Sequence, residues 1–209
     1  MQAKALEVLF ESGYLYLKVE KVCEYRAGQY FVVEYKGIKR PYSAASSPLE
    51  ESILFLVKLG LGEMSNALRS IKAGDIVGIE GPFGDFVYGG SRQAFFAAGS
   101  GIAPIRGIVK DMELRGVGKG TIFYSCREGY FPFKEELLGL KRSRVVLTVT
   151  GSAPEGWEYE KGRINAALVA KHKDSWDIAY ICGPVGFAKS MKEIAESEGV
   201  KELRIEAWG

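Results

Sequence analysis

Ala97-Ala98-Gly99-Ser100-Gly101-Ile102-Ala103-Pro104 joins an apolar, strand-like run to a helix-length amphipathic segment. Its glycines allow a tight turn and let backbone N–H groups approach a pyrophosphate, while the N-terminus of the following helix adds a partial positive charge. Pro104 stands where the usual dinucleotide fingerprint has its third glycine, and proline is tolerated in the first turn of a helix. We expect a nucleotide phosphate at residues 99–104. The alternative is a plain glycine turn before a helix, which this context makes less favoured.

The sequence beyond residue 90 alternates strand-like runs with helix-length amphipathic segments. This rhythm is typical of a parallel α/β sheet. We expect strands at residues 93–98, 121–125, 144–149, 178–182 and 202–207, and helices at residues 102–115, 133–140, 164–172 and 186–198. Residues 91–209 are therefore predicted to form a nucleotide-binding α/β domain.

The first ninety residues instead contain short runs rich in β-branched and aromatic side chains, separated by Gly, Pro and Ser. We expect strands at residues 6–10, 14–22, 29–35, 38–43, 53–59 and 75–80. One helix interrupts them at residues 64–71, where Met64, Leu68 and Ile71 recur at helical spacing. Six short strands predict a six-stranded antiparallel β-barrel in residues 1–90, so the chain is expected to hold two domains.

Composition limits the classes of function. Of the 209 residues 47% are hydrophobic and 26% are charged, as in ordinary folded proteins. The net charge of +2 is too small to indicate nucleic acid as a partner. No apolar run is long enough for a membrane helix, and no signal peptide is evident, so we expect a cytoplasmic protein without membrane insertion. Few amides beside many Lys, Arg and Glu resemble the composition of a thermophile.

Cysteine and histidine usage argues against metal chemistry. Cys23, Cys126 and Cys182 lie far apart without a C-x-x-C pair. This spacing disfavours a disulfide framework, a zinc site or an iron–sulfur cluster held by the chain itself. The single histidine, His172, lies among charged residues and is interpreted as a solvated helix end. We expect no metal site and no Ser-His-Asp triad.

Arg40-Pro41-Tyr42-Ser43-Ala44-Ala45-Ser46 ends one of the predicted barrel strands. Alternate residues of a strand share a face, so Arg40 and Tyr42 would lie side by side. The cation could then meet a phosphate while the ring stacks on a planar heterocycle. An exposed strand end followed by a turn fits the same residues equally well.

Taken in order, these motifs resemble the ferredoxin-NADP reductase superfamily, in which a flavin-binding barrel precedes a nicotinamide-nucleotide domain. The resemblance covers nearly the whole chain. Arg40-Pro41-Tyr42-Ser43 matches the Arg-x-Tyr-Ser flavin motif of that family. The resemblance implies that Arg40 holds flavin phosphate, Tyr42 packs on the isoalloxazine ring and Ser43 hydrogen-bonds near its reactive nitrogen.

Two further barrel segments carry the same resemblance. Leu56-Val57-Lys58 matches the strand along the ribityl chain of the flavin, and Gly62-Glu63-Met64-Ser65 matches the Gly-x-x-Ser that opens the phosphate-binding helix. Independently, Ser65 and the free N–H groups at that helix start make a credible anion site. The resemblance implies FAD as the cofactor and leaves FMN open.

The second domain adds three matches. Residues 99–104 resemble the family's Gly-Thr-Gly-x-x-Pro, with Ser100 keeping the hydroxyl. Cys182-Gly183-Pro184 resembles the Cys-Gly-Pro whose cysteine faces the nicotinamide; without this context Cys182 would be interpreted as an inert buried thiol. Glu206-Ala207-Trp208-Gly209 resembles the terminal Glu-x-aromatic of plant-type members, with Trp in place of Tyr and one extra glycine. Ser43, Cys182, Glu206 and Trp208 are thereby expected to be the catalytic residues.

The resemblance implies a flavoprotein that transfers a hydride from NADH or NADPH to bound FAD and passes electrons to a separate acceptor. Ferredoxin or another iron–sulfur protein, an oxygenase, a partner subunit and free flavin all remain open as acceptors. One alternative is an electron-transfer subunit of dihydroorotate dehydrogenase type, although the cysteine cluster of that subunit is missing here. Others are a non-catalytic sensor of NAD(P)H or flavin, and a barrel adaptor fused to an unrelated nucleotide-binding enzyme.

The choice between NADH and NADPH depends on the end of the second strand of the nucleotide domain. Arg127 could pair with a 2′-phosphate, whereas the adjacent Glu128 would repel one or bind the bare ribose hydroxyls. No second arginine follows Thr150-Gly151-Ser152. The sequence therefore favours NADH slightly.

Overall fold

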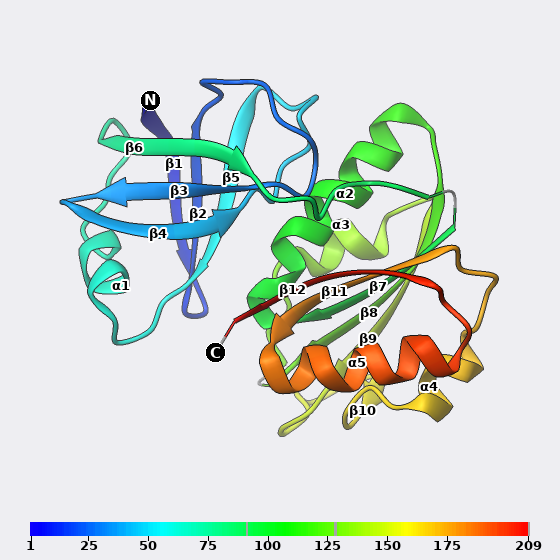
Figure 1. Cartoon of the computed structure of the whole chain (residues 1–209). Coiled ribbons are helices and arrows are strands. Elements are labelled where there is room, and N and C mark those ends of the chain that lie inside the picture. The colour runs from blue at the N-terminus through cyan, green and yellow to red at the C-terminus, as the bar shows by residue number, and fades with distance from the viewer. Residues whose placement is uncertain (91, 128, 209) are drawn as a thin grey trace.

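The first sheet is an antiparallel barrel. A computed structural model describes residues 1–90, 92–127 and 129–208, which form two sheets side by side (Figure 1). The first holds β1 (Gln2–Glu11), β2 (Tyr14–Glu20), β3 (Tyr30–Tyr35), β4 (Ile38–Ser43), β5 (Ser52–Lys58) and β6 (Ile76–Phe83). Its order is β4-β3-β6-β1-β2-β5, and every neighbouring pair is antiparallel.

The two edge strands of this sheet, β4 and β5, meet at one end only. An isolated bridge joins Ala44 to Phe55, and the Ala45 N–H donates to the Leu54 carbonyl oxygen at 2.7 Å. Among the described residues the ladder stops there. Continuing its register would place Ser43 opposite Leu56, but no strand pairing forms at these positions. The barrel therefore has an open seam between β4 and β5, and helix α1 (Glu63–Leu68) packs against β4 near it.

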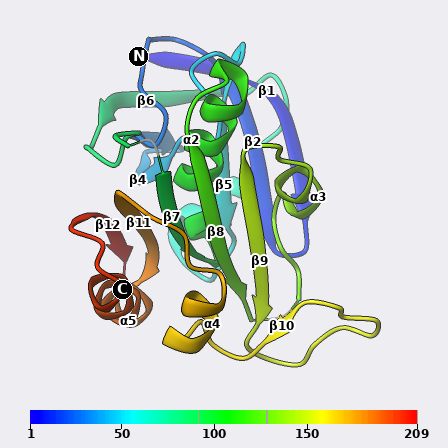
Figure 2. The same cartoon turned by 90° about the vertical axis from the view of Figure 1, so that its right-hand side faces the viewer.

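The second sheet is parallel throughout and has the order β10-β9-β8-β7-β11-β12. Its strands are β7 (Arg92–Ala98), β8 (Lys119–Cys126), β9 (Ser143–Val149), β10 (Glu160–Lys161), β11 (Ile178–Pro184) and β12 (Glu202–Trp208). Figure 2 shows β8 and β9 running side by side in one direction. Because chain order reverses at β7, the carboxyl ends of β7 and β11 form the switch point at which open α/β sheets bind ligands.

Helices cover both faces of this sheet. They are η1 (Gly99–Gly101), α2 (Ile102–Arg115), α3 (Lys134–Leu138), α4 (Ala166–Lys171) and α5 (Val185–Ser197). Ile105 and Ile108 of α2 share a buried cluster with Ala45 of the barrel side, so α2 lies between the barrel and the sheet. Val169 of α4 and Met191 of α5 belong to a different cluster on the other face. None of the described helices is long and apolar enough to cross a membrane.

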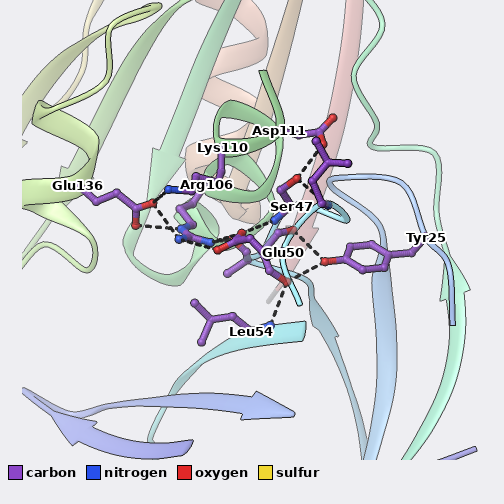
Figure 3. A network of polar contacts seen from close by, with 11 residues as sticks. Tyr25, Ser47, Glu50, Leu54, Arg106, Lys110, Asp111 and Glu136 are labelled. Atoms are coloured by element: carbon purple, nitrogen blue, oxygen red, sulfur yellow. Dashed lines mark hydrogen bonds and ion pairs between the residues drawn. The ribbon is translucent and has the colours of Figure 1, made fainter. Parts of the chain in front are cut away.

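Arg106 of α2 joins the second sheet to the barrel (Figure 3). This side chain is almost fully buried. Its Nη1 donates to the carbonyl oxygen of Ala45 at 2.7 Å and to a carboxylate oxygen of Glu50 at 3.0 Å. Its Nε and Nη2 form a bidentate pair with Glu136 at 3.0 and 2.8 Å. Although burial would raise it, the charges of Arg106 and Lys110 hold the pKa of Glu136 below its ordinary value.

Close backbone packing accompanies this network. A Cβ added at Gly107 would lie 2.8 Å from the carbonyl oxygen of Ala44, so only glycine lets α2 approach the barrel this closely. One turn further on, Asp111 accepts a hydrogen bond from Ser47 Oγ at 2.7 Å. These contacts fix α2, and with it residues 99–101, relative to the seam of the barrel.

The predicted fold class is confirmed, a six-stranded antiparallel barrel followed by a parallel α/β domain. The predicted boundary near residue 90 stays a prediction; it falls between β6 and β7. The interpretation of His172 as solvated was wrong in part. His172 does end α4, but its ring is half-buried against Phe123, and burial lowers its pKa below the ordinary value.

Candidate active site

Strand β4, on one side of the seam, carries the predicted flavin motif. Arg40 is exposed, and its guanidinium donates to the Lys39 carbonyl oxygen at 2.7 Å without pairing with a carboxylate of the described residues. Tyr42 packs against the barrel core, and burial raises its pKa to about 12. Pro41 between them is exposed. The guanidinium of Arg40, unpaired among the described residues, could bind a flavin phosphate. The half-buried ring of Tyr42, beside the seam, could pack on the flavin ring system.

Strand β5, on the other side of the seam, has fewer polar side chains than β4. Leu56 and Val57 are almost fully buried, and their side chains belong to the hydrophobic clusters. Lys58, by contrast, is exposed. A flavin chain along this strand would therefore contact main-chain atoms and Lys58, while Leu56 and Val57 pack into separate clusters on opposite faces of the strand.

Residues 60–65 lie at the start of α1. A Cβ added at Gly62 would meet no atom within 4 Å, so this backbone borders open space. The Ser65 hydroxyl accepts a hydrogen bond from Gly60 N–H at 3.1 Å and orders the turn before the helix. Met64 is buried in the barrel core and anchors the segment. The turn can thus accommodate a ligand that lies along the seam.

The 99–104 loop lies at the switch point of the second sheet. Gly99 has a φ of +55°, and its carbonyl oxygen accepts a hydrogen bond from the Tyr124 hydroxyl at 3.2 Å. A Cβ at Gly101 would lie 2.1 Å from the Cys182 carbonyl oxygen, so glycine is required for the loop to contact the end of β11. Pro104 is buried in the first turn of α2, while Ser100 is half-buried.

The ends of β11 and β12 place three of the predicted catalytic residues together. In the parallel register Cys182 pairs with Glu206, and Pro184 with Trp208. Burial, reinforced by the nearby Glu206, raises the pKa of the Cys182 thiol well above its ordinary value, so this thiol stays protonated at neutral pH. Cη2 of the Trp208 ring would lie 3.0 Å from a Cβ at Gly101. The indole therefore lies beside the nucleotide loop.

Ser43 connects this group to the barrel. Its Oγ donates a hydrogen bond to Glu206 Oε2 at 3.3 Å. The other oxygen, Oε1, lies 3.5 Å from the position of a Cβ at Gly84, which follows β6. Burial raises the pKa of Glu206 to about 7, and the hydrogen bond from Ser43 opposes this rise. The structure thus brings all four predicted catalytic residues to the junction between the seam and the ends of the parallel strands.

The remaining predicted residues lie near this junction. Gly183 is buried in the strand end, and Pro184 is exposed. Arg127 is exposed at the end of β8, where its carbonyl oxygen accepts a hydrogen bond from Gly151 N–H at 3.0 Å. Glu128, expected to disfavour a 2′-phosphate, lies outside the described residues. The preference for NADH stays a prediction.

Sequence reasoning missed the residues that hold the junction in place. Arg204 of β12 donates to the carbonyl oxygens of Val87 and, at 3.4 Å, of Asp85, in the segment between the two sheets. Tyr16 of the barrel and Tyr130 beyond β8 share a hydrogen bond at 2.8 Å. Arg106, an arginine within the otherwise apolar first two turns of α2, was the one visible signal of such a contact.

Two family models match the chain in sequence. Residues 14–88 match the "Oxidoreductase FAD-binding domain", and residues 95–193 match the "Oxidoreductase NAD-binding domain". The first coincides with the barrel and seam, and the second with the parallel sheet and the 99–104 loop. The order of the two matches is the order expected from the motifs.

Curated relatives include two proteins that are subunits of redox enzymes. The probable dihydroorotate dehydrogenase B (NAD(+)) electron transfer subunit of Methanopyrus kandleri is 26% identical over 89% of this chain and 70% of the relative. A subunit of the Na(+)-translocating NADH-quinone reductase of Pasteurella multocida is 30% identical over 80% of this chain. The aligned part amounts to 48% of that relative, about half of its length.

Solved structures show the same fold. A ferredoxin NADP+ reductase from Neisseria gonorrhoeae with bound FAD and NADP superimposes with a TM-score of 0.84 at 20% identity. The superposition covers 99% of this chain and 98% of that structure. At this identity the similarity supports the arrangement of both domains.

Proposed function

Since the chain belongs to the ferredoxin reductase-type oxidoreductases, which join an FAD-binding domain to an NAD-binding domain, we propose a specific reaction for it. The chain is an NAD(P)H-dependent flavin oxidoreductase. In the proposed reaction a hydride passes from NADH or NADPH to bound FAD, and the electrons then leave for a separate acceptor.

One observation carries this proposal, the contact of Ser43 with Glu206. Ser43 ends the strand that bears the flavin motif, and Glu206 is the register partner of Cys182 at the end of the nucleotide domain. A ligand in the seam and a ligand on the 99–104 loop would therefore approach each other at this place. Transfer of a hydride needs such an approach of two bound groups, because orientation supplies much of the rate.

The bound FAD would supply the redox chemistry, and the chain's residues would position it and control protons. Glu206, with a pKa raised to about 7, can hold or release a proton at its carboxyl oxygens near neutral pH. The Ser43 hydroxyl fixes the orientation of that carboxyl group. Cys182 contributes a neutral, buried thiol that excludes water without adding charge.

A separate protein as the electron acceptor is supported by the relatives. The Methanopyrus protein is by its name an electron transfer subunit, and the Pasteurella protein is one subunit of a quinone reductase. We infer an iron–sulfur protein such as ferredoxin as the acceptor class, with an oxygenase or free flavin as the alternatives.

A second candidate is a subunit that works only inside a larger complex. The similarity to the Methanopyrus subunit, which extends over 89% of this chain, favours it. In that case the isolated chain would still pass electrons from the nucleotide to ferricyanide but would turn over slowly with ferredoxin and with free FMN. A sensor would bind the nucleotide and show no turnover.

The test is steady-state oxidation of NADH and NADPH by the purified, flavin-loaded chain with ferricyanide, free FMN and a ferredoxin whose reduction is visible by absorbance as acceptors. We expect continuous turnover with ferricyanide. Turnover with ferredoxin would identify the acceptor class, whereas turnover with ferricyanide alone would favour the larger complex. Binding of either nucleotide without turnover with any acceptor would contradict the enzyme and favour the sensor.

A further inference from the structure

Strand β12 lies at the edge of the parallel sheet and carries two of the side chains that meet at the junction (Figure 2). Within the described part of the chain its main chain pairs with β11 alone. Alternate residues of a strand share a face, so Arg204, Glu206 and Trp208 lie along one face of β12. Glu206 contacts Ser43 of the barrel, and the Trp208 ring lies beside Gly101. The position of β12 therefore decides where both side chains lie.

Arg204 connects β12 to the segment between the two sheets. Its Nη1 donates to the carbonyl oxygens of Val87 and, at 3.4 Å, of Asp85. The guanidinium also lies 5.8 Å from the centre of the Tyr180 ring on the neighbouring strand. Val87 is almost fully buried, and its carbonyl oxygen accepts a second hydrogen bond, from the Tyr180 hydroxyl at 2.9 Å. The segment is thus fixed to β11, and Arg204 fixes β12 to the segment.

Two glycines let this segment pass close to β12. A Cβ at Gly84 would lie 3.5 Å from Glu206 Oε1, and a Cβ at Gly89 would lie 2.5 Å from Arg204 Nη2. The guanidinium therefore occupies the space that a side chain at position 89 would need. A contact this close leaves Arg204 little freedom, and β12 is held at a defined distance from residues 84–89.

Arg204 also pairs with Glu202 of its own strand, at 3.0 Å between Nη2 and Oε1. The Glu202 side chain is 54% exposed, and exposed ion pairs contribute little. A pair within one strand cannot fix that strand to another element. The hydrogen bonds to Val87 and Asp85 are therefore the contacts of Arg204 that place β12.

We propose that Arg204 is a positioning residue for hydride transfer, a role that rests on the function proposed above. By fixing β12 to residues 84–89 it holds Glu206 against Ser43 and Trp208 beside Gly101. It acts through these two side chains and not on the reacting atoms. Without this contact the end of β12 can shift, because an edge strand has a main-chain partner on one side only. The Trp208 ring then competes less with the nicotinamide, and the nicotinamide is oriented less well for transfer.

The proposal predicts two changes in opposite directions. Anaerobic rapid mixing of the flavin-loaded chain with NADH and NADPH gives the limiting rate constant of flavin reduction, and titration with NAD⁺ and NADP⁺ gives their affinities. In Arg204→Met, which keeps an apolar stem beside Tyr180, the rate constant should fall about ten- to a hundredfold. The oxidised nucleotide should bind about two- to tenfold more tightly, as far as stacking of Trp208 is lost. A merely structural role of Arg204 would instead weaken binding and slow reduction together.

Two further variants separate the contact from the residue. Gly89→Ala keeps Arg204 but adds a Cβ where its Nη2 lies, so the guanidinium must move and the same two changes should appear. The displaced atom is the end of a flexible side chain, so this variant should fold, and it decides the question if Arg204→Met does not. Glu202→Gln is the matched control. It removes only the pair within β12 and should behave as the parent in both measurements.

A double variant tests the route. Arg204→Met combined with Trp208→Ala should bind oxidised nucleotide no more tightly than Trp208→Ala alone, because both changes remove the same competition. Tightening by the product of the two single effects would mean that Arg204 does not act through Trp208.

Three other results would overturn the proposal. They are an unchanged rate constant and affinity in both Arg204→Met and Gly89→Ala, weaker binding of nucleotide with slower reduction, and equal effects of Glu202→Gln and Arg204→Met. A parent whose flavin neither nucleotide reduces would contradict the proposed function and the role of Arg204 with it. A parent that is reduced, beside variants that match it, would remove the role of Arg204 alone.

Discussion

Ser43 Oγ donates a hydrogen bond to Glu206 Oε2 across 3.3 Å, although the two residues are 163 positions apart in the sequence. The contact closes the junction between the barrel seam and the end of β12. It also withdraws the Glu206 carboxyl group from water, and burial is the main cause of its raised pKa. The ionisation of this one side chain should therefore report on the state of the junction.

Glu206→Gln should change how stability depends on pH. The folded state keeps a proton on Glu206 up to a pKa of about 7, whereas the unfolded chain releases it near 4.5. The parent therefore loses stability as pH rises from about 4.5 to about 7, and glutamine does not. After allowance for partial exposure, the free energy of unfolding of the variant relative to that of the parent should rise by about 2 kcal/mol between pH 4 and pH 8.

Urea titrations at several pH values measure this difference. Glu193→Gln, at an exposed position of α5, is the control and should parallel the parent at every pH. A constant offset between Glu206→Gln and the parent from pH 4 to pH 8 would mean that the carboxyl group titrates as in water.

Arg40→Ala should weaken flavin binding. A charge-assisted contact with phosphate is worth about 1.5–3 kcal/mol, which corresponds to roughly ten- to a hundredfold in affinity. Lys39→Ala is the matched control, because it removes the neighbouring charge of β4, which pairs with Glu34 at 3.4 Å and with Glu80. Fluorescence titration of the apoprotein with FAD gives both affinities. Equal loss in the two variants would remove the specific assignment of Arg40.

Arg106→Ala should destabilise the whole chain. The change leaves Glu50 and Glu136 without their shared cation at 3.0 and 2.8 Å, and also removes a hydrogen bond to the barrel backbone. Because both carboxylates are partly exposed, we expect a loss of about 2–4 kcal/mol in the free energy of unfolding. The control is Lys192→Ala in α5, whose pair with Glu196 is half-exposed on both sides. It should cost no more than about 1 kcal/mol in the same denaturation experiment.

Local sequence patterns predicted the elements whose bounds are set by nearby residues, and missed a strand that depends on pairing with a distant segment. The predicted ranges 38–43 and 102–115 match β4 and α2 as observed. The turn residue Gly37, with a φ of +77°, precedes the first, and the glycine loop with Gly116 after the last turn defines the second. The two-residue strand β10 was missed because Glu160-Lys161 has no apolar pattern, and only its pairing with β9 makes it a strand.

In the candidate site, too, local motifs could be predicted and a long-range contact could not. The motifs were visible in the sequence because they gather glycines and polar residues at the ends of predicted strands. The contact of Ser43 with Glu206 could not be predicted, since it depends on how α2 places one domain on the other through Arg106 and Gly107. The residue roles, the cytoplasmic location and a thermophilic source stay predictions.

Trp208→Ala should tighten the binding of oxidised nucleotide. Trp208 is 41% exposed and its ring lies beside Gly101, and we predict that an incoming nicotinamide must displace it. Aromatic stacking is worth about 0.5–1.5 kcal/mol, so its removal should tighten NAD⁺ or NADP⁺ binding about two- to tenfold. Turnover should fall if product release becomes limiting.

Titration of flavin-loaded Trp208→Ala with each oxidised nucleotide, followed by visible absorbance, measures this effect. A new long-wavelength band should accompany binding, and the nucleotide that gives it is the preferred one. Unchanged affinity and no new band in a folded, yellow protein would return Trp208 to a packing role. Truncation after residue 207 also removes Gly209, which lies outside the described residues, so the point variant is the cleaner test.

The visible spectrum of the purified chain under anaerobic conditions, before and after addition of NADH or NADPH, tests the central claim most directly. If the seam binds flavin and the 99–104 loop presents the nucleotide to it, the protein is yellow as purified or after incubation with FAD. The visible absorbance band of the oxidised flavin then bleaches within seconds with at least one of the two nucleotides, as expected for ordinary enzyme turnover. A chain that stays colourless with both FAD and FMN, or a yellow chain that neither nucleotide bleaches, would contradict the account.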